Sequence, residues 1–320
     1  MDEKMFTPGG MERMQALSDR DNVPYPRGDG MVKLVNTGWL ADHLNDSNLT
    51  ILDVQPDVHD YIQEHIPGAV YLTEGVLRVS NRGFPTTYSP NSCIQEAFRR
   101  AGVEADSPVV VYTSKGAFSG RGDGLAQTMM AYTLAKYGHN KVYLLDGGLD
   151  AWKSEGLELS QDYPTVEPSN FTVEVRDEYA IGYEEFVRIK DNEGVVVLDA
   201  RPAKFYEGQG PWRVAGHIPG AINLPWRSLM TDENPMQFRS NAELDIILEE
   251  HGVDRNQTVI CTCGTGREAT NEFVLLKWLY LYPNVRIYEG SFTEWVSRPG
   301  SPVVEGPESR ERRAETAPAR

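Results

Sequence analysis

The chain has 320 residues, of which 40% are hydrophobic and 24% are charged, a composition typical of a soluble globular protein of about two domains. Its 31 Lys and Arg residues against 47 Asp and Glu residues give a formal net charge of −16, which argues against nucleic acid or an anionic membrane surface as the main partner. No apolar run approaches the roughly 18 residues of a membrane span. The first 30 residues contain no apolar signal segment, so we expect a cytoplasmic protein.

The chain has three cysteines, Cys93, Cys261 and Cys263, which are too few for a disulfide framework. Cys261 and Cys263 alternate along a predicted strand and therefore point to opposite faces, so we expect no disulfide between them. Three cysteines and six histidines do not give the spacing of a zinc site.

The two halves of the chain repeat each other. Three pairs of similar segments occur in the same order, offset by about 150 residues. This offset indicates a duplicated domain of about 130 to 150 residues, in contrast to the short units of a solenoid. The pairs are residues 51–56 with 197–202, 65–69 with 217–221, and 147–152 with 290–295.

Each half is predicted to alternate short apolar strands with helices. This alternation predicts α/β domains, each with a mainly parallel sheet flanked by helices. In the first half we expect helices at 36–44, 91–101 and 124–137, and strands at 50–54, 109–112 and 142–145. In the second half we expect helices at 182–189, 241–251 and 269–280, and strands at 195–200, 258–261 and 285–288.

The domain boundaries follow from composition. We predict a first domain over residues 31–160 and a second over 171–299, joined by a polar linker at 161–170 that contains two prolines. Residues 1–30 are either a disordered lead or an arm that packs on the body. The tail at 300–320 is rich in Glu, Arg and Pro, and we expect it to be disordered.

The most informative segment is the loop at residues 263–269, which reads Cys-Gly-Thr-Gly-Arg-Glu-Ala between a buried strand and a long helix. Ligands of open α/β sheets bind beyond the carboxyl ends of the strands. Here successive backbone N–H groups can point at one spot, helped by the positive end of the following helix. We therefore predict Cys263 as a nucleophile with a lowered pKa.

The residues after Cys263 are the predicted substrate-binding residues. Gly264 and Gly266 permit backbone conformations that a Cβ would penalise, and Thr265 lies between them. Arg267 adds a cation. Glu268 opposes the thiolate unless it points outward or binds a basic side chain.

Two arginines outside the loop are further candidates. Arg201 ends a strand and either binds an anionic donor or forms an ion pair within its own domain. Arg213 lies in an insertion before residue 216 and could supply a cation near the nucleophile. Cys261 and Cys93 are expected to be ordinary core cysteines.

Together these motifs resemble the rhodanese family of sulfurtransferases in its tandem form. The resemblance covers residues 34–296, apart from the termini. It rests on Asp-Ala-Arg at 199–201, Gly-His-Ile-Pro-Gly-Ala at 216–221, the loop at 263–269, and Leu-Asp-Gly-Gly at 145–148 followed by Trp152.

The resemblance implies that sulfur is carried as a Cys263 persulfide, formed from a small anionic donor and passed to cyanide, a thiol or a thioredoxin-like acceptor. It implies no metal and no organic cofactor, and no nucleic-acid or membrane partner. We expect thiosulfate as the donor, with 3-mercaptopyruvate almost equally supported. Family members often place a second donor-binding arginine where this chain has Phe205, which leaves the donor open.

The first domain is expected to be catalytically silent, because Ser114 lies opposite Cys263 and a serine cannot carry a persulfide. The glycine-rich segment 115–124 that follows Ser114 either covers the active site from the partner domain or is a degenerate surface loop. His65 and His217 occupy matching positions in an active and a silent half, so we expect a structural role for both.

Three other hypotheses about the function remain open. A Cys-loop phosphatase or arsenate reductase needs an arginine six positions after the cysteine, and position 269 is Ala. A non-catalytic binding protein would leave Cys263 without a purpose. A sulfur carrier would transfer to a protein acceptor with negligible turnover on cyanide.

Overall fold

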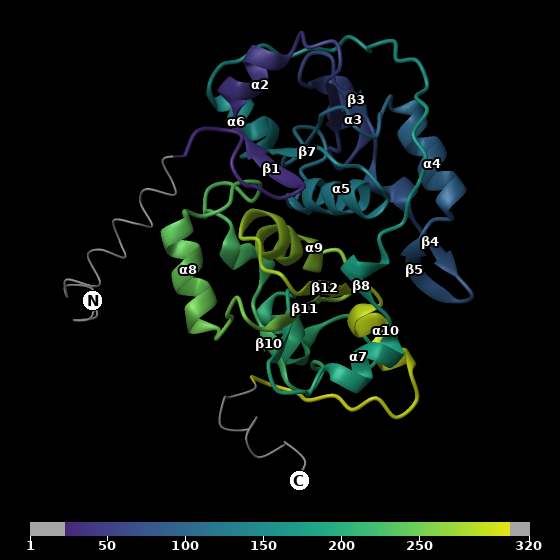
Figure 1. Cartoon of the computed structure of the whole chain (residues 1–320), viewed down its shortest axis with the longest axis vertical. Coiled ribbons are helices and arrows are strands. Elements are labelled where there is room, and N and C mark those ends of the chain that lie inside the picture. The colour runs from purple at the N-terminus through teal and green to yellow at the C-terminus, as the bar shows by residue number, and fades with distance from the viewer. Residues whose placement is uncertain (1–22, 308–320) are drawn as a thin grey trace, which may run out of the picture.

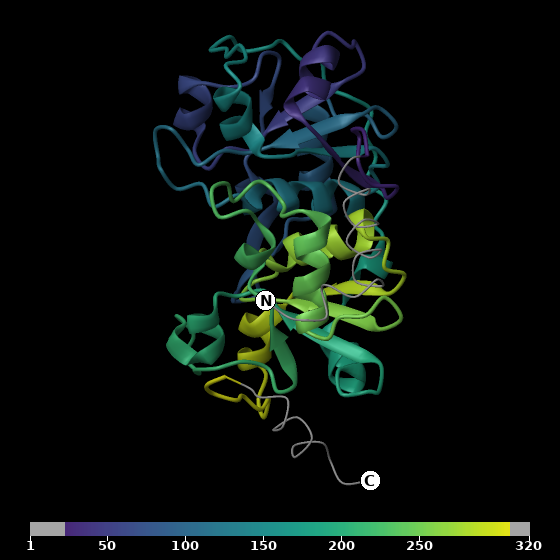
Figure 2. The ribbon, with the colours of Figure 1, turned by 90° about the vertical axis from the view of Figure 1, so that its left-hand side faces the viewer.

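The structure is a computed structural model that describes residues 23–307. Residues 1–22 of the predicted lead at 1–30, and residues 308–320 of the predicted tail at 300–320, lie outside the described residues. Two α/β domains are stacked along the long axis of the molecule, the first above the second in Figure 1 and again in the side view of Figure 2.

The elements of the first domain are β1 (Val32–Val35), α2 (Thr37–His43), β2 (Thr50–Asp53), α3 (Val58–Gln63), β3 (Val70–Tyr71), β4 (Arg78–Asn81), β5 (Phe84–Tyr88), α4 (Asn91–Arg100), β6 (Val109–Tyr112), α5 (Leu125–Lys136), β7 (Val142–Leu145) and α6 (Gly148–Ser154). Those of the second are β8 (Ala180–Ile181), α7 (Tyr183–Ile189), β9 (Val195–Asp199), β10 (Ala221–Asn223), α8 (Asn241–Glu250), β11 (Thr258–Thr262), α9 (Ala269–Phe273), β12 (Val285–Tyr288) and α10 (Ser291–Ser297). Short 3₁₀ helices lie at Glu74–Leu77, Asp177–Tyr179 and Trp226–Leu229, and π-helical turns, which are wider than an α-helix, at Phe205–Gln209 and Val274–Leu279.

The two sheets have the same topology. Their strand orders are β1-β7-β6-β2-β3 and β8-β12-β11-β9-β10, and every neighbouring pair in both sheets is parallel. Strands covered on both faces read as continuous apolar runs, as in the fully buried Val109–Tyr112. The predicted fold class, two α/β domains with parallel sheets, is confirmed.

The two domains share one hydrophobic core. α5 is buried along its whole length, which explains why its sequence shows no polar face. It packs against α9 between the two sheets, with Tyr132 edge-on to Phe273 at 5.1 Å and Thr128 Oγ1 3.1 Å from Thr270 Oγ1. The predicted helix at 269–280 is α9 followed by the wider turn at Val274–Leu279.

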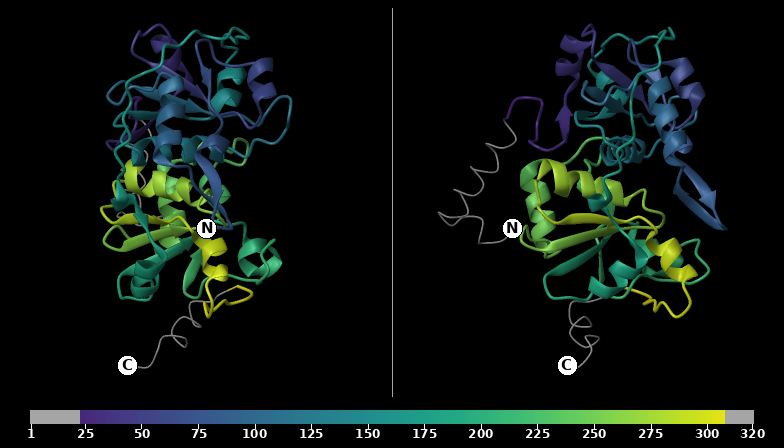
Figure 3. Two further views of the ribbon diagram at one scale, coloured as in Figure 1. Left: turned by 90° about the vertical axis from the view of Figure 1, so that its right-hand side faces the viewer. Right: turned by 45° about the vertical axis from the view of Figure 1, so that its right-hand side comes forward.

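A hairpin that the sequence analysis did not predict extends from the first domain. β4 and β5 pair antiparallel, and Arg82 and Gly83 connect them with φ values of +50° and +83°. A two-residue turn of this kind suits the twist of the strands. The right-hand view of Figure 3 shows the hairpin reaching down beside the second domain.

Both described ends of the chain pack on the body. Tyr25 Oη donates to Asp146 Oδ2 at 3.0 Å, as an arm would. The expectation that the tail is disordered from residue 300 is wrong for its first part, because Val304 pairs through its backbone with His217 and Trp295 Nε1 donates to Pro302 O at 2.8 Å. No helix among residues 23–307 has the length and apolar character needed to cross a bilayer.

Candidate active site

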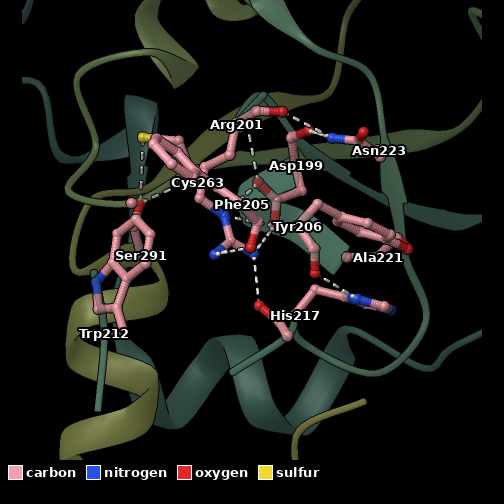
Figure 4. A network of polar contacts seen from close by, with 12 residues as sticks. Asp199, Arg201, Phe205, Tyr206, Trp212, His217, Ala221, Asn223, Cys263 and Ser291 are labelled. Atoms are coloured by element: carbon pink, nitrogen blue, oxygen red, sulfur yellow. Dashed lines mark hydrogen bonds and ion pairs between the residues drawn. The ribbon is translucent and has the colours of Figure 1, made fainter. Parts of the chain in front are cut away.

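Cys263 directly follows β11, the central strand of the second sheet, at the carboxyl edge where ligands of such sheets bind. The Gly266 N–H donates to Cys263 Sγ at 3.0 Å, so the loop folds back on its own sulfur. The Cys263 side chain is fully buried in this conformation. Figure 4 shows its sulfur beside Ser291.

Ser291 contacts Cys263 through its hydroxyl group, and the sequence did not identify it as a site residue. Cys263 N–H donates to Ser291 Oγ at 3.2 Å, and Oγ lies 3.9 Å from Sγ and donates to Tyr288 O at 2.8 Å. Ser291 has φ +51°, whereas the matched residue of the first domain, Gly148, has φ +61°. A non-glycine residue in this conformation is strained, and such strain is concentrated at functional sites. The difference between matched repeat positions is the signal that could have identified Ser291.

The two loop glycines are required by geometry. Gly266 has φ +84°, and a Cβ there would lie 2.7 Å from Glu289 O. A Cβ on Gly264 would lie 2.6 Å from the ring of Trp212. Neither position accepts a side chain without a shift of its neighbours.

Trp212 covers the loop at Gly264 and is a second residue that the sequence analysis missed. Its Nε1 donates to Thr293 Oγ1 at 2.8 Å, and its ring meets Phe292 edge-on at 5.4 Å. Trp212 directly precedes Arg213, in the insertion before residue 216 that the sequence analysis considered as a source of a cation. Trp212 rather than Arg213 is therefore the part of the insertion that contacts the loop.

Arg201 is fully buried inside the second domain. Its Nε donates to Asp199 Oδ1 at 2.9 Å and its Nη2 to Asp199 Oδ2 at 2.6 Å, and Nη2 also donates to Gly216 O at 3.1 Å. Its guanidinium group lies 4.2 Å from the Phe292 ring centroid. Of the two roles predicted for Arg201, donor binding or an ion pair within its own domain, the structure shows the ion pair. Arg213 is exposed and makes no hydrogen bond or ion pair with the part of the chain that the structure describes.

Arg267 is held by the first domain. Its Nε donates to Glu74 Oε1 at 2.6 Å, and its Nη1 and Nη2 donate to the two Asp123 carboxylate oxygens at 2.5 and 3.0 Å. Arg78 of β4 also donates to Thr265 O. The charge of Arg267 is therefore matched by two carboxylates before any substrate binds.

The glycine-rich segment 115–124 takes part in this contact between domains. Asp123 belongs to it, and Lys115 Nζ donates to Glu233 O of the second domain at 2.9 Å. A Cβ on Gly124 would lie 2.4 Å from Pro235 O. The segment therefore contacts Arg267 of the Cys263 loop through Asp123, while the prediction that it covers the active site stays a prediction.

The prediction of a lowered pKa for Cys263 is wrong for this conformation. Burial raises the pKa of the thiol, and the neighbouring Glu268 carboxylate raises it further. The backbone N–H groups of Ala269 and Thr265 lower the pKa, as the sequence predicted, but their effect is smaller. The fully buried position of the sulfur outweighs the loop dipoles.

The other two cysteines differ from each other. Cys261 is fully buried, and burial together with Glu272 raises its pKa well above the usual value. Glu272 is buried as well, and burial followed by the charge of Asp199 raises its pKa. Cys93 lies exposed on α4, so the expectation that it is a core residue is wrong.

The first domain has a corresponding loop, held by different polar groups. Ser114 Oγ donates to Gln55 Oε1 at 2.6 Å and accepts from Gly116 N–H at 2.9 Å. Gln55, the counterpart of Arg201, donates through Nε2 to Asp53 Oδ2 at 2.8 Å. The loop is thus closed by neutral hydrogen bonds around a hydroxyl group.

His65 and His217 have equivalent surroundings. Each is fully buried, and its ring stacks on a tyrosine, Tyr61 at 4.0 Å or Tyr206 at 3.6 Å. Each Nδ1 is hydrogen-bonded to the carbonyl oxygen of that tyrosine, at 2.7 and 3.0 Å. The shared arrangement confirms the expected structural role. Among residues 23–307, no group of three or more His, Cys, Asp or Glu residues is placed to hold a metal ion.

Comparison with known proteins identifies the family. Residues 36–155 and 183–298 each match the Rhodanese-like domain, so the chain belongs to the rhodanese family of sulfurtransferases in its tandem-domain form. It is 34% identical over 285 residues to a putative thiosulfate sulfurtransferase of Synechococcus elongatus, covering 87% of this chain and 86% of that protein. It is 30% identical to the sulfur carrier protein TtuD of Thermus thermophilus, covering 86% and 97% of the two chains. The crystal structure of SseA from Escherichia coli, described as a 3-mercaptopyruvate sulfotransferase, is similar with a TM-score of 0.71 at 27% identity, covering 81% of this chain and 98% of SseA.

Proposed function

We propose that this sulfurtransferase carries sulfane sulfur as a persulfide on Cys263 and delivers it to a thiol or to cyanide. The observation that carries the proposal is the position of Sγ inside its own loop, 3.0 Å from the Gly266 nitrogen, at the carboxyl edge of the central strand. N–H groups pointing at the sulfur can stabilise a persulfide anion once it forms. Ser114, the residue of the first domain that matches Cys263, has no sulfur atom and cannot form a persulfide.

The reaction has two displacement steps. In the first, the Cys263 thiolate attacks the outer sulfur of the donor, the bond from that sulfur to the rest of the donor breaks, and the electron pair leaves with the donor remainder. In the second, the acceptor attacks the same sulfur and the pair returns to Cys263. Because Sγ is fully buried, the loop or a covering side chain must shift before a donor can reach it.

The preferred donor carries one negative charge, as 3-mercaptopyruvate does. Arg201 is engaged with Asp199, and Arg267 with Glu74 and Asp123, so neither offers a free cation to the doubly charged thiosulfate. Glu268 adds a carboxylate that raises the pKa of Cys263, so a second negative charge on the donor is disfavoured near the sulfur. This reverses the order of donors expected from the sequence.

The test is intact-mass spectrometry after mixing the protein with each donor separately. Wild type should gain about 32 Da on Cys263, lose it on addition of cyanide, and load faster from 3-mercaptopyruvate than from thiosulfate. Cys263→Ser should gain nothing while remaining folded, and Cys93→Ser, which removes the exposed cysteine, should load like wild type. Loading of the Cys263→Ser variant would reject the site, and faster loading from thiosulfate would reject the donor assignment.

A further inference from the structure

A cavity of about 1030 Å³ opens beside the catalytic loop and does not take part in the mechanism described above. The β4–β5 hairpin of the silent domain forms one wall, and β8, α7 and α10 of the catalytic domain form the other. Thr265 and Gly266 line its inner edge, and Gly266 is the residue whose N–H binds Cys263 Sγ. Its volume is at the upper end of the range for pockets that enclose drug-sized ligands, far larger than cyanide or thiosulfate requires.

The hairpin contributes two arginines without a carboxylate partner among the described residues. Arg78 donates to Thr265 O, and its Nε is buried with no hydrogen-bond partner. Arg82 is exposed at the tip of the hairpin, in a left-handed conformation that favours Gly or Asn. A long cationic side chain at this strained position suggests a function for it.

The carboxylates of the cavity are mostly neutralised. Glu289 is paired with Lys136, and Glu294 with Arg298. Asp177 lines the same cavity, is exposed and has no ion pair within residues 23–307. Among the described residues that line the cavity, the charged groups without an ion-pair partner are therefore the guanidinium groups of Arg78 and Arg82 on the hairpin and the carboxylate of Asp177. This arrangement fits a ligand with carboxylates at one end and an ammonium group at the other.

We propose that this cavity is the acceptor subsite and that it binds a zwitterionic low-molecular-weight thiol, such as a short peptide, with its carboxylates on Arg78 and Arg82. The proposal rests on the proposed function, because the acceptor must meet a sulfur held on Cys263. The acceptor thiolate attacks the outer sulfur of the persulfide, a new S–S bond forms, the bond to Cys263 breaks, and the electron pair stays on the Cys263 sulfur. Charge and atoms balance without any further reactant.

Discharge of the preloaded persulfide distinguishes this subsite from the donor site. Glutathione, a tripeptide thiol with two carboxylates and one ammonium group, is the probe, and cyanide is the small acceptor that needs no subsite. In Arg82→Asn, which suits the left-handed turn, the glutathione concentration for half-maximal discharge should rise about tenfold, the loss expected for one charge-assisted contact. Discharge by cyanide and loading by either donor should be unchanged. Arg255→Asn, which removes an exposed arginine far from the cavity, is the matched control.

A second measurement is independent of persulfide chemistry. Cys263→Ser should bind S-methylglutathione, which has no reactive thiol, and the added Arg82→Asn change should weaken that binding about tenfold by calorimetry. Binding without any persulfide in wild type would leave the subsite standing and reject the proposed function. Unchanged glutathione discharge and unchanged binding in Arg82→Asn would overturn the subsite. A variant that alters donor loading instead of discharge would also overturn it.

Discussion

Matched positions in the two halves show how single residues distinguish the loop at Cys263 from the loop at Ser114. Cys263 is replaced by Ser114, which changes a sulfur nucleophile into a hydroxyl hydrogen-bonded to its neighbours. Ser291 is replaced by Gly148 in the same left-handed conformation, so the catalytic half accepts backbone strain to place a hydroxyl on the Cys263 N–H. At this matched pair of positions, the strained non-glycine residue lies in the half that contains Cys263.

Glu268 is the residue for which charge makes the clearest prediction. Its carboxylate raises the pKa of Cys263, so Glu268→Gln should lower that pKa and increase the thiolate fraction at every pH below it. We expect persulfide loading at pH 7 to accelerate by roughly threefold to tenfold and its pH profile to move toward acid. Stopped-flow loading across pH 6 to 10 measures this. Glu193→Gln, an exposed change in the same domain, should leave the profile where it is, and an identical profile for Glu268→Gln would refute the charge effect.

Among the structural elements, the loop from Cys263 to Glu268 depends on its neighbours for its shape. Gly266 fits under Glu289 O at the start of the α10 turn, and Gly264 fits under Trp212. Thr293 of α10 donates twice to Gly264 O, through N at 3.0 Å and through Oγ1 at 2.7 Å. α10 and the insertion therefore position the backbone that positions the sulfur.

Gly266→Ala tests this dependence. The new Cβ would meet Glu289 O at 2.7 Å, so the loop must shift and the N–H bond to Cys263 Sγ should be lost. We expect persulfide loading to slow by at least about tenfold, the cost of one preorganised donor. Gly156→Ala is the matched control, since Gly156 has φ +70° with open space around it, and it should lose about 1 kcal/mol of stability and no activity. Equal activity loss in both variants would mean that strain alone is responsible.

At the scale of the whole molecule, the first domain contributes side chains that contact the Cys263 loop of the second. It provides Glu74 and Asp123 to Arg267, and Arg78 to Thr265. It also provides α5, whose apolar surface packs against α9 in a core common to both domains. The first domain therefore has a structural and electrostatic role at the Cys263 loop, whatever its own activity.

Asp123→Asn measures this coupling between domains. It leaves Arg267 with one charged partner, so the free energy of unfolding should fall by about 1 kcal/mol, the discounted value for a half-exposed pair. A double-mutant cycle with Arg267→Gln in chemical denaturation should give a coupling energy of similar size, smaller at high salt. Glu96→Gln, which removes the exposed pair with Arg100, is the control and should change stability by a few tenths of a kcal/mol. A cycle with no coupling would show that the contact does not bind the domains together.

The sequence by itself determined the duplicated α/β fold, because strands buried on both faces must be apolar and their order repeats along the chain. The strands predicted at 109–112 and 285–288 are β6 and β12, and the loop after β11 was identified from its Cys and Gly residues alone. The strands and the loop can be predicted because each depends on residues that are adjacent in the sequence.

Only the tertiary structure decided what surrounds the sulfur. Trp212, Ser291 and Glu74 come from separate parts of the chain, and no local pattern relates any of them to Cys263. The burial that raises the Cys263 pKa is likewise a property of the assembled domains, since it arises from atoms that packing brings near. Arg201 and Arg267 were recognised as cations in the sequence, but their carboxylate partners, which decide whether their charge is available to a substrate, are known only once the chain has folded.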